Sequence, residues 1–125
     1  MSFFDRIFRR KQKADIPPML SWETVVEMMH NKHLDAFSDE VVEVIYSKDR
    51  SMRYVVLKGD NNLLTYQLEV IYQFDEDEWK YIYSHDNALP AMWEPFSGIV
   101  CKSFFESAEK LRKEIESEPE YKQYF

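Results

Sequence analysis

The feature that most constrains the fold of this chain is a run of alternating residues between positions 63 and 74. Apolar and aromatic side chains occupy every second position of this run: Leu64, Tyr66, Leu68, Val70, Tyr72 and Phe74. Most of the intervening positions are polar, and only Leu63 and Ile71 break the alternation. Successive side chains of a strand point to opposite faces, so the run predicts an antiparallel strand with one buried face and one wet face.

Two shorter segments before this run also favour strands. Residues 40–47 and 52–58 are rich in Val, Ile and Tyr, and a polar turn at 48–51 separates them. Gly, Asp and Asn at positions 59–62 tolerate the dihedral angles of a tight turn, so we expect the second segment to turn directly into the long strand.

A fourth strand is predicted at residues 79–84. Trp79, Tyr81 and Tyr83 alternate with other residues there, and the acidic segment 75–78 before them is typical of a solvated hairpin turn. Residues 85–102 contain two prolines and are expected to be irregular.

Helices are predicted on both sides of the strands. Ser21 is a suitable N-cap for a helix at about 22–33, whose apolar stripe ends near Met29. Ser103 and Glu106 match a capping box, which predicts a second helix running to about Ser117. Pro119 can start one final helical turn.

The element order is therefore α-β-β-β-β-α, an α+β class. Short turns between consecutive strands favour a four-stranded antiparallel meander, and the two amphipathic helices are expected to cover one face of it. We expect residues 19–125 to form a single domain. Residues 1–18 are expected to form a basic amphipathic arm, with a short helix at 2–11 and a Pro-containing linker.

The arm differs in charge from the rest of the chain. Its first thirteen residues carry five cations and one acid, whereas the whole chain has a net charge of −7. Three interpretations remain open: packing on the acidic body or on a second copy as a homodimer, weak contact with an anionic membrane surface, and a frayed terminus. The residues expected to make the arm's contacts are Phe3, Phe4, Arg6, Ile7, Phe8, Arg9 and Arg10.

Composition argues against several classes of protein. A single cysteine, Cys101, excludes an internal disulfide and a Cys-rich zinc site. Strong acidity argues against nucleic-acid binding, which needs clustered Lys and Arg. There is no long apolar run and no secretory signal, so we expect a cytoplasmic protein, either free or at the inner membrane surface.

No residue pattern specifies a reaction. Glu27, His30 and His33 lie at helical spacing, but a carboxylate-bridged metal site needs further ligands from other helices. Cys101 precedes a predicted helix, where a thiol pKa is lowered, yet a small buried side chain explains it equally. We therefore expect no cofactor and no metal, and favour a protein without enzymatic activity.

The best candidate for a binding surface is aromatic. Trp and Tyr dominate protein interfaces because they bury a large area at low entropic cost, but the Trp93 segment can also plug the sheet edge. The same residues could line a small-ligand pocket near the 85–102 loop. The candidate surface consists of Trp79, Tyr81, Tyr83, His85, Trp93, Glu94 and Phe96.

In size, acidity and element order the chain is similar to small bacterial accessory proteins, among them immunity proteins of toxin systems. That similarity, which no motif carries, implies an adaptor-like protein that binds a protein partner, and the acidity of the chain suits a basic one. The alternatives are a peripheral membrane protein held by its arm, and a small-ligand binder or enzyme.

Overall fold

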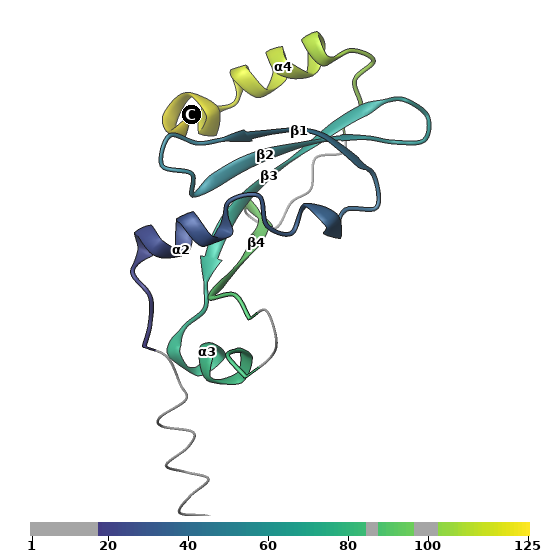
Figure 1. Ribbon diagram of the computed structural model, residues 1–125. Helices are drawn as coiled ribbons and strands as arrows, with labels where there is room; N and C mark the ends of the chain where they lie inside the picture. The colour runs from purple at the N-terminus through teal and green to yellow at the C-terminus, as the bar shows by residue number, and fades with distance from the viewer. Residues whose placement is uncertain (1–17, 85–87, 97–102) are drawn as a thin grey trace, which may run out of the picture.

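The computed structural model describes residues 18–84, 88–96 and 103–125. Four strands form one antiparallel sheet in the order β1-β2-β3-β4, so the predicted α+β class and meander are confirmed (Figure 1). The strands are β1 (Glu40–Tyr46), β2 (Met52–Lys58), β3 (Leu64–Gln73) and β4 (Ala91–Pro95). The helices are α2 (Trp22–Met29), the 3-10 helix η1 (Leu34–Ala36), α3 (Glu76–Ile82), α4 (Ala108–Ser117) and α5 (Pro119–Tyr124).

The strand β3 joins the two halves of the sheet. It pairs with β2 from Leu64 to Val70 and with β4 from Glu69 to Gln73. The alternating run therefore does form a strand. Its polar face is not wet, however, because Glu69 and Ile71 are each only 5% exposed. Alternation identifies the strand but does not say what covers its second face.

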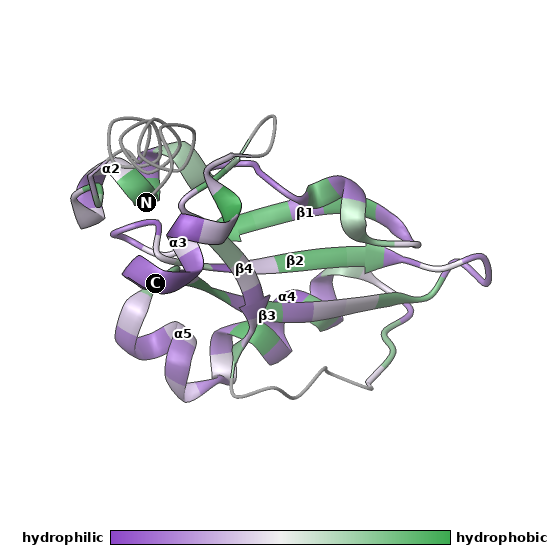
Figure 2. Cartoon of the chain, turned by 90° about the horizontal axis from the view of Figure 1, so that it is seen from below, coloured by the Kyte–Doolittle hydropathy of each residue, from purple (hydrophilic) through white to green (hydrophobic). Residues whose placement is uncertain are grey.

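The helices lie on opposite faces of the sheet, so the expectation that both cover one face is wrong. Helix α2 packs its buried side chains against Ile71 and Trp93, whereas α4 packs Leu111 and Ile115 against the face that carries Tyr54 and Tyr66. Figure 1 shows α2 and α4 on the two sides of the strands. The physical reason is that both faces of the sheet carry apolar side chains that need a cover. Figure 2 shows β1 and β2 largely green, and successive residues of a strand face opposite sides of the sheet.

The fourth strand is not at residues 79–84, as the sequence pattern predicted. Those residues lie largely in α3, which Asp75 starts as N-cap by accepting from the backbone N–H of Glu78, while the Glu78 side chain accepts from the N–H of Asp75. This reciprocal capping stabilises a helix start and outweighs the alternation. The strand β4 lies instead in the segment predicted to be irregular, with Pro95 at its end, as an edge strand permits.

Both flanking helices are shorter than predicted. Helix α2 ends at Met29. Asn31 and His33 follow with φ angles of 61° and 60°, and a residue with a positive φ angle cannot continue a right-handed α-helix. Helix α4 begins at Ala108 with Ser107 as its N-cap. The predicted start at Ser103 is wrong because the chain after it is still extended there: Phe105 forms an antiparallel bridge with Leu64.

The predicted arm, including the helix expected at residues 2–11, lies outside the described residues. The turn started by Pro119 is confirmed as α5.

Candidate functional site

The residues of the candidate binding surface are distributed between the core and the surface. Trp79 and Trp93 are buried, at 7% and 6% exposure, whereas Tyr81 is 82% exposed. The partly buried members are Tyr83, Glu94 and Phe96, and His85 lies outside the described residues.

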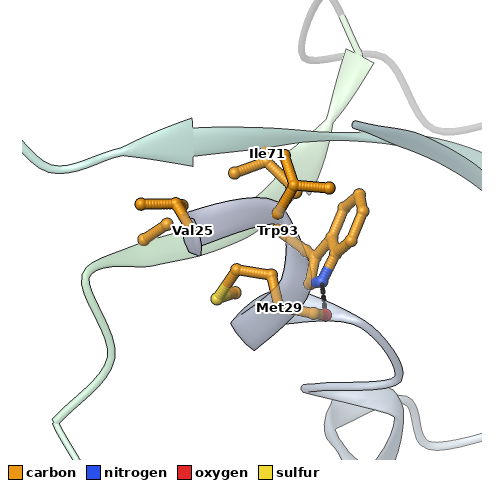
Figure 3. Close-up of a cluster of buried hydrophobic side chains, with 6 residues drawn as sticks. Val25, Met29, Ile71 and Trp93 are labelled. Atoms are coloured by element: carbon orange, nitrogen blue, oxygen red, sulfur yellow. Dashed lines mark hydrogen bonds between the residues drawn. The ribbon is translucent and has the colours of Figure 1, made fainter. Parts of the chain in front are cut away.

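Trp93 is part of the core beneath α2. Its Nε1 donates a hydrogen bond of 2.9 Å to the carbonyl of Met29, as Figure 3 shows, and Ile71 is its partner on β3. The guanidinium of Arg53 lies 4.1 Å from the centre of its ring. Trp93 therefore joins a helix end, two strands and a buried cation, and leaves little surface for a partner.

A buried ion pair lies next to Trp93. Arg53 and Glu69 face each other on β2 and β3, with 2.9 Å between Nε and Oε1. Arg53 also donates to the carbonyl of Lys32 at 2.9 Å, and Gln67 donates to the second oxygen of Glu69 at 3.0 Å. These added hydrogen bonds offset the desolvation cost of burying the pair. Nη2 of Arg53 has no hydrogen-bond partner among the described residues. Sequence reasoning missed the pair, whose signal was an arginine within an otherwise apolar strand.

Among the described residues, Glu27, His30 and His33 do not form a metal site. The ring of His30 contacts that of Tyr46 in a tilted arrangement, with 4.3 Å between centroids. Within the part of the chain that the structure describes, no group of three or more His, Cys, Asp or Glu side chains could hold a metal ion. Cys101 lies outside the described residues.

An open hollow lies away from the predicted pocket. It has a volume of about 540 Å³ and sits between the start of β1 and the β2–β3 turn. Its lining is polar and includes three carboxylates and one lysine, which suits solvent better than an apolar ligand. The lining residues are Ser38, Asp39, Glu40, Lys58, Gly59, Asp60 and Asn62.

Two of the exposed aromatic side chains, Tyr72 and Tyr81, belong to the end of β3 and to α3, which follows it. Tyr72 and Met92 are cross-strand partners, so their side chains share one face of the sheet, and they are 37% and 39% exposed. This is the face that α4 covers further along, at Tyr66. Tyr81 follows Glu78 by three residues, which places the two on neighbouring positions of the α3 surface.

Carboxylates lie near Tyr72. The hydroxyl of Tyr72 donates a hydrogen bond of 2.6 Å to Oε1 of Glu78. This hydrogen bond, with smaller contributions from the charges of Asp75 and Glu94, raises the pKa of Tyr72 to about 12. Glu78 therefore both caps α3 and fixes the tyrosine. We define the acidic–aromatic patch as Tyr72, Met92, Tyr81, Asp75, Glu76, Asp77, Glu78 and Glu94.

Within the described residues, Lys80 forms an ion pair with the patch. Lys80 lies 3.8 Å from Glu76, and both side chains are well exposed, so this pair contributes little to stability. With Lys80 included, the patch has a net charge of −4. It therefore combines exposed aromatic area with a strong negative potential, which can attract a cation and then pack against its apolar stem.

Comparison of the chain with models of protein families, with curated proteins and with solved structures found no match. Among the helices of the described residues, none has the length and apolar character needed to cross a membrane. The function is therefore inferred from the geometry of the patch.

Proposed function

We propose that this chain is a non-enzymatic protein-binding module that holds a basic partner on its acidic–aromatic patch. The observation that carries the proposal is the exposure of Tyr72, Met92 and Tyr81 beside five carboxylates. The proposal includes a cytoplasmic location, which the sequence favours because it contains no secretory signal.

The patch has the parts from which binding energy is built. A tyrosine that is 82% exposed offers a large area to bury, and exposed aromatic side chains are the commonest hot spots of interfaces. The bond between Tyr72 and Glu78 restricts the tyrosine before a partner arrives, which lowers the entropic cost of binding.

The charge of the patch defines the chemistry of the partner. Clustered carboxylates accelerate encounter with a positive surface and repel a negative one. A guanidinium can both pair with Glu94 or Glu78 and stack on Tyr81. We therefore expect a protein segment in which Arg or Lys alternates with apolar residues.

The test begins with capture of protein partners by the full chain, followed by affinity measurement with the purified partner. The informative variant is Tyr81→Ser, and the matched control is Tyr124→Ser, since Tyr124 is 42% exposed on α5. Loss of a hot spot of about 2 kcal/mol corresponds to roughly thirtyfold weaker binding, whereas the control should change it by less than about twofold.

Salt provides the second measurement. Affinity should fall as ionic strength rises, since exposed charges are screened. Equal binding by the Tyr81→Ser and Tyr124→Ser variants, or turnover of a small substrate without any protein partner, would contradict the proposal.

A further inference from the structure

The described chain starts near the end of β3. Nε2 of Gln73 donates a hydrogen bond of 3.1 Å to the carbonyl of Leu20, which packs on the face that α2 covers. Tyr72 of the patch precedes Gln73 and faces the opposite side of the sheet, so the chain has to pass the end of the strand to reach the patch. Position 20 is therefore fixed at the end of β3 where α3 begins. Residues 14–19 between the arm and this point can span up to about 20 Å when extended. The arm is thus tethered within reach of the patch.

The sequence of the arm complements the patch in two respects. Residues 1–13 carry a net charge of +4, opposite to the −4 of the patch with Lys80. Phe3, Phe4, Ile7 and Phe8 recur at the spacing of one helical face and supply apolar area for exposed aromatic side chains. This is the alternation of basic and apolar residues that the patch chemistry selects.

We infer that residues 2–11 dock on the acidic–aromatic patch of their own chain. The apolar side chains of the arm then cover Tyr72, Tyr81 and Met92, and Arg6, Arg9 and Arg10 face the surrounding carboxylates. A short tether gives the arm an effective concentration in the millimolar range, so a contact with a Kd of about 0.1 mM or less is largely formed within one chain.

Docking of the arm makes it a built-in competitor for the patch. A basic partner has to displace the arm from the patch, and this regulatory consequence rests on the proposed function. The docking of the arm is independent of the proposed function, because it needs no partner.

Photo-crosslinking in the full chain tests the docking. A benzophenone amino acid replaces Phe8, the protein is irradiated at low micromolar concentration, and the crosslinked peptides are identified by mass spectrometry. We expect crosslinks within one chain, to the segments 72–81 and 92–94. Raising the salt from about 0.05 M to about 0.5 M should reduce their yield severalfold, because it shortens the screening length.

Two triple variants separate patch charge from overall charge. Glu76→Gln, Asp77→Asn and Glu94→Gln together remove three charges from the patch while leaving the cap formed by Asp75 and Glu78 intact. The matched control removes three charges from the exposed side of α4 and the turn before it, through Glu106→Gln, Glu109→Gln and Glu114→Gln. The patch variant should lower the crosslink yield at least threefold, and the control should leave it unchanged.

Equal yields from the two triple variants, crosslinks that map to α4, or crosslinks found mainly between two chains would overturn the inference. Failure of the Tyr81→Ser binding test with intact crosslinking would instead reject the proposed function alone.

Discussion

On the face of the sheet beneath α4, two tyrosine hydroxyls share one carboxylate, whereas on the face beneath α2 an arginine and a glutamate pair inside the packing. Tyr54 and Tyr66 donate to the two oxygens of Glu118, at 2.6 and 2.5 Å, and Glu118 is the half-buried N-cap of α5. Arg53 and Glu69 are 0% and 5% exposed. The charge beneath α4 is half-buried and close to water. The stability of the face beneath α2 depends on both partners of a buried ion pair.

The largest expected effect comes from breaking the pair beneath α2. Glu69→Ala leaves the buried guanidinium of Arg53 without its counter-charge, which should lower the free energy of unfolding by about 3–5 kcal/mol. Urea denaturation followed by circular dichroism measures this loss. The double variant Arg53→Met with Glu69→Leu should recover most of it, since no uncompensated charge then remains buried. A loss below about 1 kcal/mol in Glu69→Ala would show that the pair is not a structural requirement.

On the face beneath α4, the next largest effect should follow from an apolar deletion. Ile115 is fully buried against that face, so Ile115→Ala should cost about 2–4 kcal/mol through lost burial and a residual cavity. The exposed neighbour Glu114 is the control, and Glu114→Ala should change stability by less than about 0.5 kcal/mol. If both variants melt at the same temperature, α4 does not cover the sheet.

Glu118→Gln should have a smaller effect, because an amide oxygen still accepts from one tyrosine. We expect a loss of about 1–2 kcal/mol, as two hydrogen bonds to a charged acceptor are weakened. Burial and the hydrogen bond to Glu118 raise the pKa of Tyr54 above its ordinary value of 10.0. The folded state therefore holds this proton more tightly, so that its stabilising contribution is complete below pH 10.0 and is lost as the pH rises further. Urea denaturation across this range should show a shallower fall in the variant than in the unaltered chain.

The smallest effect on stability is expected for the exposed pair of Tyr72 and Glu78. Glu78→Gln should bring the pKa of Tyr72 down from about 12 toward 10.0, because the acceptor loses its charge. An ultraviolet absorbance titration measures this change, with Tyr72→Phe in the same background identifying the titrating residue. An unchanged titration would mean that the hydrogen bond does not hold Tyr72 in solution.

The contrast between the faces also explains what the sequence could predict. Local patterns located β1, β2 and β3, the start of α2 and the turn at Pro119, because alternation and capping act over a few residues. Trp79, Tyr81 and Tyr83 alternate like a strand, yet the capping box of Asp75 and Glu78 makes a helix there. Asp75 and Glu78 are visible in the sequence as a capping box, but four consecutive acidic residues are also typical of a solvated turn.

Other features depend on register and therefore on the whole sheet. Arg53 meets Glu69 only because β2 and β3 align those two positions, and the ring of Trp93 then lies against the guanidinium. Of the candidate surface, Tyr81 is the aromatic residue with the greatest exposure, while Trp79 and Trp93 are buried. Composition cannot distinguish a surface aromatic from a core aromatic, since both roles favour the same residue types.

The hydrogen bonds of Tyr54 and Tyr66 to Glu118 have a consequence for the protein during its synthesis. The ring of Phe125 lies 4.9 Å from that of Tyr54, and the carbonyl of Tyr124 accepts from the N–H of Lys48 in the β1–β2 turn. A growing polypeptide therefore presents the aromatic face of β2 and β3 uncovered until α4 and α5 have also been synthesised. During that interval the nascent chain exposes a surface to which chaperones bind or on which neighbouring chains aggregate.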